Sequence, residues 1–133
     1  MSLQSAVKAV FVVASLFLAG QPAQAFEQKK FDKAAVEAAQ TAGKPVLIHI
    51  TAPWCPTCKA QHKVLDSLSK KPDLADIAVF DVDFDTQPEV VKSYKATSQS
   101  TLIAFNGTTE TGRLAGATQP AAIEELLKST MKK

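Results

Sequence analysis

The chain has 133 residues, with 15 basic and 13 acidic side chains, a length that fits one domain. Its formal net charge of +2, with no basic stripe carrying interleaved aromatic residues, argues against nucleic acid as a partner. The hydrophobic fraction of 46% is typical of a globular chain, and we expect a monomer.

The N-terminal segment has the pattern of a secretory signal peptide. Lys8 is followed by an apolar run over residues 9–20, and the Ala-Gln-Ala of residues 23–25 has the small-x-small form of a cleavage site. The apolar run is too short to cross about 30 Å of hydrocarbon as a helix, and an uncleaved anchor is the alternative. The sequence therefore predicts a cleaved signal peptide over residues 1–25, a domain over residues 26–133, and a periplasmic or otherwise exported protein.

Helical and β-type patterns alternate along the rest of the chain, which indicates an α/β domain. The Thr86-Gln87-Pro88-Glu89 run has the form of a capping box that opens a helix. Asn-Gly at residues 106–107 is a tight-turn signal, so the strands on either side are expected to be antiparallel. In chain order we expect a helix over residues 31–41, a strand over 46–51, a helix over 56–69, a strand over 77–82, a helix after 88, strands over 101–105 and 109–114, and a helix from 120.

The two cysteines, Cys55 and Cys58, stand where a predicted strand gives way to a predicted helix. A bridge between them closes almost no loop, so it suits a reversible redox couple better than a structural staple. Cys55 falls at the helix N-terminus, where free N–H groups and the helix dipole favour a thiolate. Cys58 lies one turn further on, shielded, and close enough to resolve a mixed disulfide.

Three neighbours belong to the same motif. Pro56 suits the first helical turn, because its missing N–H had no partner within the helix there. Thr57 completes the dipeptide between the cysteines, which does not by itself fix the reduction potential. Trp54 is expected to cover one side of the cysteine pair and to offer an apolar contact to a partner.

A metal site is the competing interpretation of the two cysteines. Structural zinc sites use four ligands, and the chain offers His49 and His62 as further ones. His62 lies one helical turn after Cys58, whereas His49 lies in a predicted buried strand. Soft thiolates would select copper(I) or zinc. The other interpretation of His62 is a solvated residue on the helix surface.

Between His49 and Gly116 the sequence resembles the thioredoxin superfamily. The resemblance rests on the Trp-Cys-Pro-Thr-Cys-Lys run of residues 54–59, on the strand over 101–105 with its Asn-Gly turn, and on Gly116 before the last helix. The first of these runs is similar to that of periplasmic cytochrome c maturation thioredoxins. The resemblance implies one thioredoxin-like α/β domain, in which helices flank a central mixed β-sheet.

The resemblance also implies an activity and partners. An exported protein-disulfide oxidoreductase of this kind needs no cofactor beyond its redox-active Cys55–Cys58 disulfide. Cys55 would attack a disulfide in a protein substrate, and Cys58 would release the reduced product. A membrane thiol reductase would return the electrons, which favours the reductase direction in cell redox homeostasis, although an oxidase uses the same residues in reverse.

Three positions depart from the family pattern. A buried acid that assists deprotonation of the second thiol is replaced by His49, which we expect to act as a catalytic base, the alternative being a satisfied core histidine. A lysine under the active site is replaced by Asp81, which we expect to pair with His49. A cis-proline before the strand over 101–105 is replaced by Ser100, whose preceding peptide we expect to be trans.

In the family, the segment around Ser100 faces the cysteines and pairs with the substrate backbone. Ser100 and Thr101 are therefore the predicted substrate-binding residues, together with Trp54. A serine in place of the proline also keeps the metal alternative open, because it brings a hydroxyl near the two sulfurs. In that alternative, Ser100 or His62 would be a further ligand of a metal ion bound by Cys55 and Cys58.

Overall fold

A computed structural model describes Gly20 and residues 25–132 of the chain. The predicted signal peptide, apart from Gly20 and Ala25, lies outside the described residues. Within the described part, no helix is both long enough and apolar enough to span a bilayer.

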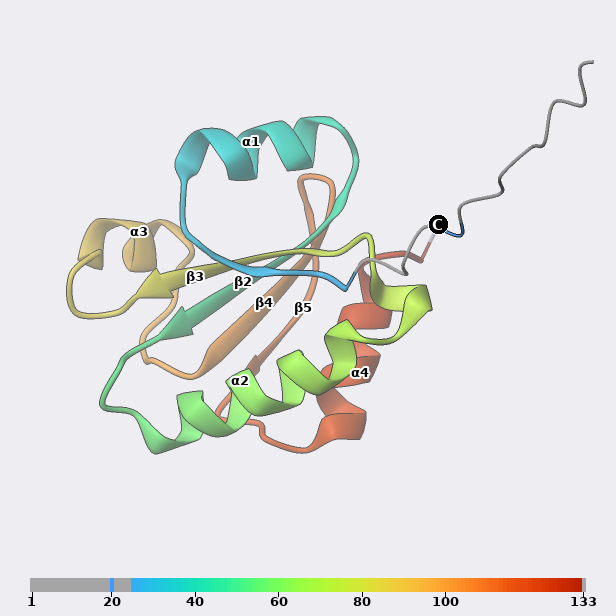
Figure 1. The fold of residues 1–133 in the computed structure, drawn as a ribbon. Helices are drawn as coiled ribbons and strands as arrows, with labels where there is room; N and C mark the ends of the chain where they lie inside the picture. The colour runs from blue at the N-terminus through green and yellow to red at the C-terminus, as the bar shows by residue number, and fades with distance from the viewer. Residues whose placement is uncertain (1–19, 21–24, 133) are drawn as a thin grey trace, which may run out of the picture.

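The strands of the described residues form one mixed sheet in the order β1-β3-β2-β4-β5 (Figure 1). β3 runs parallel to β1 and β2, whereas β4 runs antiparallel to β2 and β5. The strands are β1 (Gln28–Lys30), β2 (Pro45–Thr51), β3 (Ala78–Asp83), β4 (Thr101–Asn106) and β5 (Thr109–Ala115). The predicted α/β architecture with a central mixed sheet is therefore confirmed.

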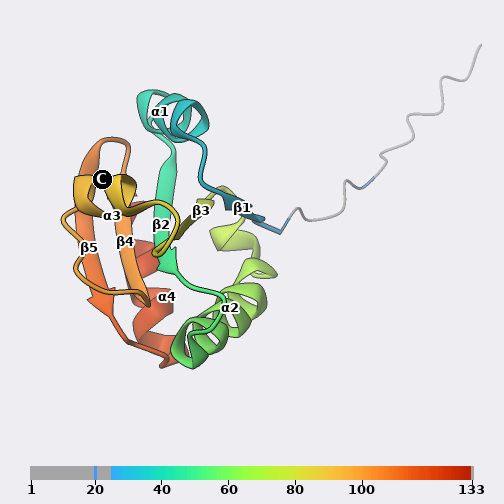
Figure 2. The same cartoon turned by 90° about the vertical axis from the view of Figure 1, so that its left-hand side faces the viewer.

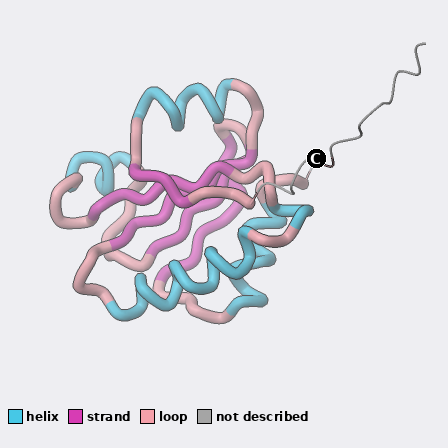
Figure 3. Tube along the Cα trace, viewed as in Figure 1, coloured by secondary structure: helices cyan, strands magenta, loops and turns pink. Residues whose placement is uncertain are grey.

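Helices cover both faces of this sheet. α1 and α3 lie on one face, and α2 and α4 lie on the other (Figures 1 and 2). Figure 3 shows the same two layers of helix on either side of the strands. The helices are α1 (Lys33–Thr41), α2 (Pro56–Ser69), the 3-10 helix η1 (Pro72–Leu74), α3 (Pro88–Ser93) and α4 (Pro120–Ser129).

The two faces of β2 supply two separate cores, because successive side chains of a strand point to opposite sides of the sheet. Leu47 packs toward α2 and α4, whereas Ile48 and Ile50 pack toward α1 and α3. Each fully buried aliphatic side chain contributes about 1.5–3 kcal/mol of transfer free energy, so both faces hold the helices in place. His49 falls between these residues and points to the α2 side, where it lies fully buried.

The predicted capping box at the start of α3 is wrong. The helix begins at Pro88 with Gln87 as its N-cap residue, and no side chain caps it. Instead, the carboxylate of Asp83 at the end of β3 accepts hydrogen bonds from the N–H groups of Asp85 and Thr86, each at 2.9 Å. Thr86 is therefore part of the turn that leads into the helix.

The predicted hairpin between β4 and β5 is confirmed. Asn106 pairs with Thr109 across a two-residue loop. Gly107 has φ +57°, a left-handed conformation that glycine adopts without steric cost. Its N–H also donates to the carbonyl of Lys44, which ties the turn to the residue before β2.

Candidate active site

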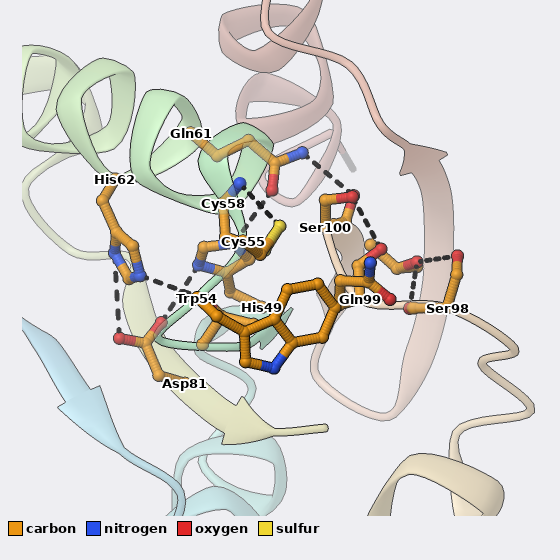
Figure 4. The surroundings of a disulfide bond; sticks show 12 residues. His49, Trp54, Cys55, Cys58, Gln61, His62, Asp81, Ser98, Gln99 and Ser100 are labelled. Atoms are coloured by element: carbon orange, nitrogen blue, oxygen red, sulfur yellow. Dashed lines mark hydrogen bonds and ion pairs between the residues drawn. A yellow bond between two sulfur atoms is a disulfide. The ribbon is translucent and has the colours of Figure 1, made fainter. Parts of the chain in front are cut away.

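A disulfide joins Cys55 and Cys58 at the start of α2 (Figure 4). Cys55 is the N-cap residue with extended backbone, and Pro56 takes the first helical position, as predicted. The N–H of Cys58 donates to Cys55 Sγ at 3.1 Å. Cys55 is 3% exposed and Cys58 is fully buried, so the second sulfur is the more shielded of the pair. The motif thus places one sulfur where the helix N-terminus favours negative charge.

Trp54 lies exposed beside the disulfide, with 57% of its surface accessible. Its indole N–H donates to the Asp85 carboxylate at 2.6 Å, which holds the ring in the position that Figure 4 shows in front of the cysteines. Asp85 comes from the turn after β3, so this turn orients the tryptophan. Thr57 occupies the second helical position and is half-buried. An exposed aromatic ring next to a buried disulfide offers an apolar surface for a partner.

His49 and Asp81 meet beneath the disulfide, as predicted. The two residues are register partners on the parallel strands β2 and β3. His49 Nδ1 lies 3.1 Å from Asp81 Oδ1. The His49 side chain is fully buried, whereas that of Asp81 keeps 22% of its surface exposed. The pair is therefore anchored in the sheet on one side and open to solvent on the other.

Gln61 connects His49 to two loops, and the sequence analysis missed it. Its side-chain N–H₂ group donates to the carbonyls of Ser100, at 3.0 Å, and Ala117, at 2.9 Å. Its Oε1 lies 2.9 Å from His49 Nε2. Because both carbonyls can only accept, the amide orientation is fixed, and His49 Nε2 must carry a hydrogen to bond the amide oxygen. Gln61 thus determines the tautomer of the buried histidine.

His62 is half-buried and bonded, so it is more than a solvated residue of the helix surface. Its Nδ1 lies 2.6 Å from Gln28 Oε1 and its Nε2 lies 3.2 Å from Thr51 Oγ1. Its ring centre is 4.6 Å from that of His49. Burial and the nearby imidazole of His49 lower the pKa of His62, and the Asp81 carboxylate opposes them only in part. Figure 4 shows the His62 ring turned toward Asp81.

Ser100 has an unusual backbone conformation at the edge of the site. Its φ is +56°, and the described residues contain no cis peptide bond, so the predicted trans peptide is confirmed. Its carbonyl accepts from Gln61 and from the N–H of Gly116 at 2.8 Å. Its hydroxyl donates to the carbonyl of Gln99 at 2.7 Å, and the hydroxyl of Thr101 also bonds within this loop. Both side chains are buried and turned toward their own loop, so their substrate-binding role stays a prediction.

The remaining predicted roles concern steps of the reaction. The catalytic role of His49 and the supporting roles of Thr57 and Asp81 stay predictions. The metal alternative combined the cysteines with His62 or Ser100. The residues that converge in the described part of the chain are His49, His62 and Asp81, and neither cysteine is among them.

Comparisons with known proteins agree with this arrangement. The thioredoxin family model matches residues 23–129. A thioredoxin from Mycobacterium bovis is 34% identical over 83 residues, which are 62% of this chain and 71% of that protein. The thiol:disulfide interchange protein DsbE from Escherichia coli is 59% identical over 29 residues, covering 22% of this chain and 16% of that protein. The crystal structure of Trxlp from Edwardsiella tarda superposes with a TM-score of 0.73 and 38% identity, over 76% of this chain and 98% of that one.

Proposed function

This chain belongs to the thioredoxin family, and from that premise we propose that it reduces disulfide bonds in exported proteins. It is a thioredoxin-like thiol–disulfide oxidoreductase, and its redox group is the Cys55–Cys58 disulfide. The observation that carries the proposal is the place of Cys55 at the N-cap of α2, with its sulfur accepting the N–H of Cys58. In the reduced protein the same N–H group and the helix dipole stabilise a Cys55 thiolate, which is the attacking species in disulfide exchange.

The proposed cycle moves two electrons from the reduced enzyme to the substrate. The Cys55 thiolate attacks one sulfur of a substrate disulfide, the substrate S–S bond breaks, and its other sulfur leaves as a thiolate. Cys58 loses its proton and attacks Cys55 Sγ in the mixed disulfide. The second substrate sulfur then leaves, and the Cys55–Cys58 disulfide forms. Both substrate thiolates take protons from solvent, which completes the reduction.

We propose that His49 assists the second step as a base. Its Nε2 already carries a hydrogen that Gln61 accepts, so Nδ1 is the nitrogen available for a proton. That nitrogen faces Asp81 at 3.1 Å, so His49 can take a proton directly from Cys58 only when Nδ1 carries neither a proton nor a metal ion and this contact opens. Asp81 then acts as a positioning residue, because it determines when the base is free.

Export is the second part of the proposal. Its support is the signal-peptide pattern of residues 1–25 and the burial of Phe26, which is 6% exposed and belongs to the α2–α4 core. Cleavage after Ala25 would therefore leave this core side chain in place. The similarity to a thiol:disulfide interchange protein supports exchange with partner proteins. In this scheme a membrane thiol reductase restores the dithiol, and Trp54, Ser100 and Thr101 contact the substrate.

The experiment that tests this function is the reduction potential of the Cys55–Cys58 couple, paired with insulin reduction. A potential near that of thioredoxin, about −270 mV, with turnover of insulin supports a reductase. A potential near about −120 mV would assign the opposite direction and overturn the reductase proposal. The mass of the protein recovered from the periplasm shows separately whether the chain is cleaved after Ala25.

A further inference from the structure

Beside the disulfide, three side chains converge in a way that the redox cycle does not require. His49 from β2, Asp81 from β3 and His62 from α2 place one ligand atom each within 4.8 Å of one another. Figure 4 shows both imidazole rings turned toward the Asp81 carboxylate. Each carboxylate oxygen faces the Nδ1 of one histidine, at 3.1 Å for His49 and at 3.9 Å for His62.

The contact between His49 and Asp81 requires a positive charge, carried by a proton or by a cation. Gln61 requires a hydrogen on His49 Nε2, so a neutral His49 has a bare lone pair on Nδ1. That lone pair faces a carboxylate oxygen at 3.1 Å, which puts two acceptors in contact with no hydrogen between them. Either a proton or a metal cation resolves this clash.

We propose that His49, His62 and Asp81 bind a divalent cation of the zinc class. Two imidazoles and one carboxylate are a donor set that zinc uses where it keeps an open coordination position. The proposal goes beyond the redox function and involves neither cysteine.

The two separations between the histidine nitrogens and the Asp81 carboxylate are compatible with a metal ion between them. Around a tetrahedral zinc ion with arms of about 2.0–2.1 Å, neighbouring ligand atoms lie about 3.3–3.5 Å apart. The two observed contacts, 3.1 and 3.9 Å, bracket that separation. The longer of them exceeds hydrogen-bonding distance, so a proton held by His49 does not join His62 to the carboxylate. Among the described residues, the His62 ring is hydrogen-bonded only to Gln28 and Thr51. One cation between the three groups accounts for both contacts.

The surroundings also resemble those of a metal site. A ligating histidine usually donates its other ring N–H to an oxygen that fixes its orientation, and Gln61 Oε1 provides that oxygen for His49. The His62 and Asp81 side chains are 36% and 22% exposed, which gives an ion a path from solvent. Gln28 Oε1, at 2.6 Å from His62 Nδ1, is placed to move aside or to contribute a further oxygen.

The test uses the purified oxidised protein without a polyhistidine tag, because the disulfide then removes both thiols as ligands. Zn²⁺ is titrated by calorimetry after treatment with a chelator, and Co²⁺ by visible absorption. We expect saturation at one ion per chain and Co²⁺ bands of a four-coordinate nitrogen and oxygen site. His62→Ala and Asp81→Asn should each weaken Zn²⁺ binding by at least about tenfold, comparable to or larger than the loss of an outer partner of a metal ligand.

The matched control is Asp66→Asn, which removes an exposed carboxylate one turn further along α2 and should leave the affinity unchanged. Circular dichroism of both ligand variants checks that they fold, and either folded variant suffices for the comparison. Lack of saturable binding, binding that both ligand variants retain, or binding only after reduction would overturn the proposal. So would ¹⁵N spectra in which His49 stays doubly protonated in excess Zn²⁺, because the occupant would then be a proton.

Discussion

The two faces of the sheet differ along the same two strands. On the face covered by α1 and α3, β2 presents Ile48 and Ile50 and β3 presents Phe80, all of them buried and apolar. On the face covered by α2 and α4, β2 presents Leu47 and then His49, the polar partner of Gln61. One face therefore stays apolar to the ends of the strands, whereas the other becomes polar as it approaches the disulfide.

The apolar face therefore contributes mainly to the stability of the fold, and the polar face mainly to its chemistry. The apolar face is a continuous packing surface, where the loss of a side chain leaves a cavity. The polar face holds groups that titrate, donate or bind ions next to Cys58. Substitutions on the first face should thus alter the free energy of unfolding, and those on the second should alter the steps of disulfide exchange.

Replacement of the second sulfur tests the polar face most severely. Cys58→Ser should abolish turnover, because the mixed disulfide that Cys55 forms has no neighbouring thiol to resolve it. Mass spectrometry should show the substrate covalently attached to Cys55, an adduct that the wild-type protein does not accumulate. Catalytic reduction of insulin by Cys58→Ser would contradict the proposed cycle.

Truncation on the apolar face should give the opposite result. Ile48 is fully buried, so Ile48→Ala should lower the free energy of unfolding by about 2–5 kcal/mol. The milder Ile48→Val should cost about 0.5–1.5 kcal/mol. Urea unfolding measures both losses, and the turnover of each folded variant should match that of the wild type. A changed ratio of the two exchange steps in Ile48→Val would show that the faces are coupled.

His49 tests whether the polar face acts on one step of the reaction. His49→Ala should slow resolution of the mixed disulfide by at least about tenfold more than the initial attack, and by about 10²–10⁴-fold if His49 supplies a full general-base effect. Stopped-flow fluorescence of Trp54, the one tryptophan of the chain, follows both steps. Ile48→Val, the adjacent position in β2, is the control, and a chelator in all samples removes any effect of bound metal. Equal slowing of both steps, or of neither, would refute the role of His49.

Much of the fold could be predicted because hydrophobic runs and turn residues mark its elements. The α2 helix was predicted with its observed bounds, since a proline opens it and apolar residues follow at helical spacing. The β1 strand was not, because Gln28–Lys30 is polar and is held by backbone pairing with β3. Backbone pairing of this kind leaves no side-chain pattern to read.

The site was predictable where a motif or the family resemblance pointed to it. The cysteines follow from their spacing, and the contact of His49 with Asp81 was expected because both replace family residues near the active site. The register of β2 and β3 is the physical reason that the two side chains meet. Gln61 was missed although a signal existed, because it stands in the buried stripe of α2 between Cys58 and Leu65. A polar residue in such a stripe must find a buried partner. The left-handed backbone of Ser100 depends on contacts with distant residues and could not be predicted.

The smallest predicted effect is a change in stability with pH, and it concerns Glu124 on α4, one of the two helices that cover the polar face of the sheet. Hydrogen bonds from Lys128 and Lys71 lower the pKa of this carboxyl from 4.5 to about 2. Because the folded-state pKa lies below the unfolded one, the ionised carboxylate stabilises the fold above about pH 4.5. That contribution is lost as the pH falls from about 4.5 to about 2, where the carboxylate of the folded protein takes up its proton.

The contribution is modest, since the ion pairs of Glu124 are near the surface and salt screens them. Urea unfolding of the wild type and Glu124→Gln from pH 7 to pH 2 measures it. The difference between the two proteins should be constant near neutrality and shrink toward zero in acid, and added salt should reduce it. If the difference in free energy of unfolding does not vary with pH, the substitution acts through packing and not through the charge of Glu124. Lys71 lies just after α2, so Glu124→Gln also removes an ion pair near the end of the helix that carries the cysteines. Unchanged rates of disulfide exchange in this variant would show that the chemistry depends only on the groups close to the disulfide.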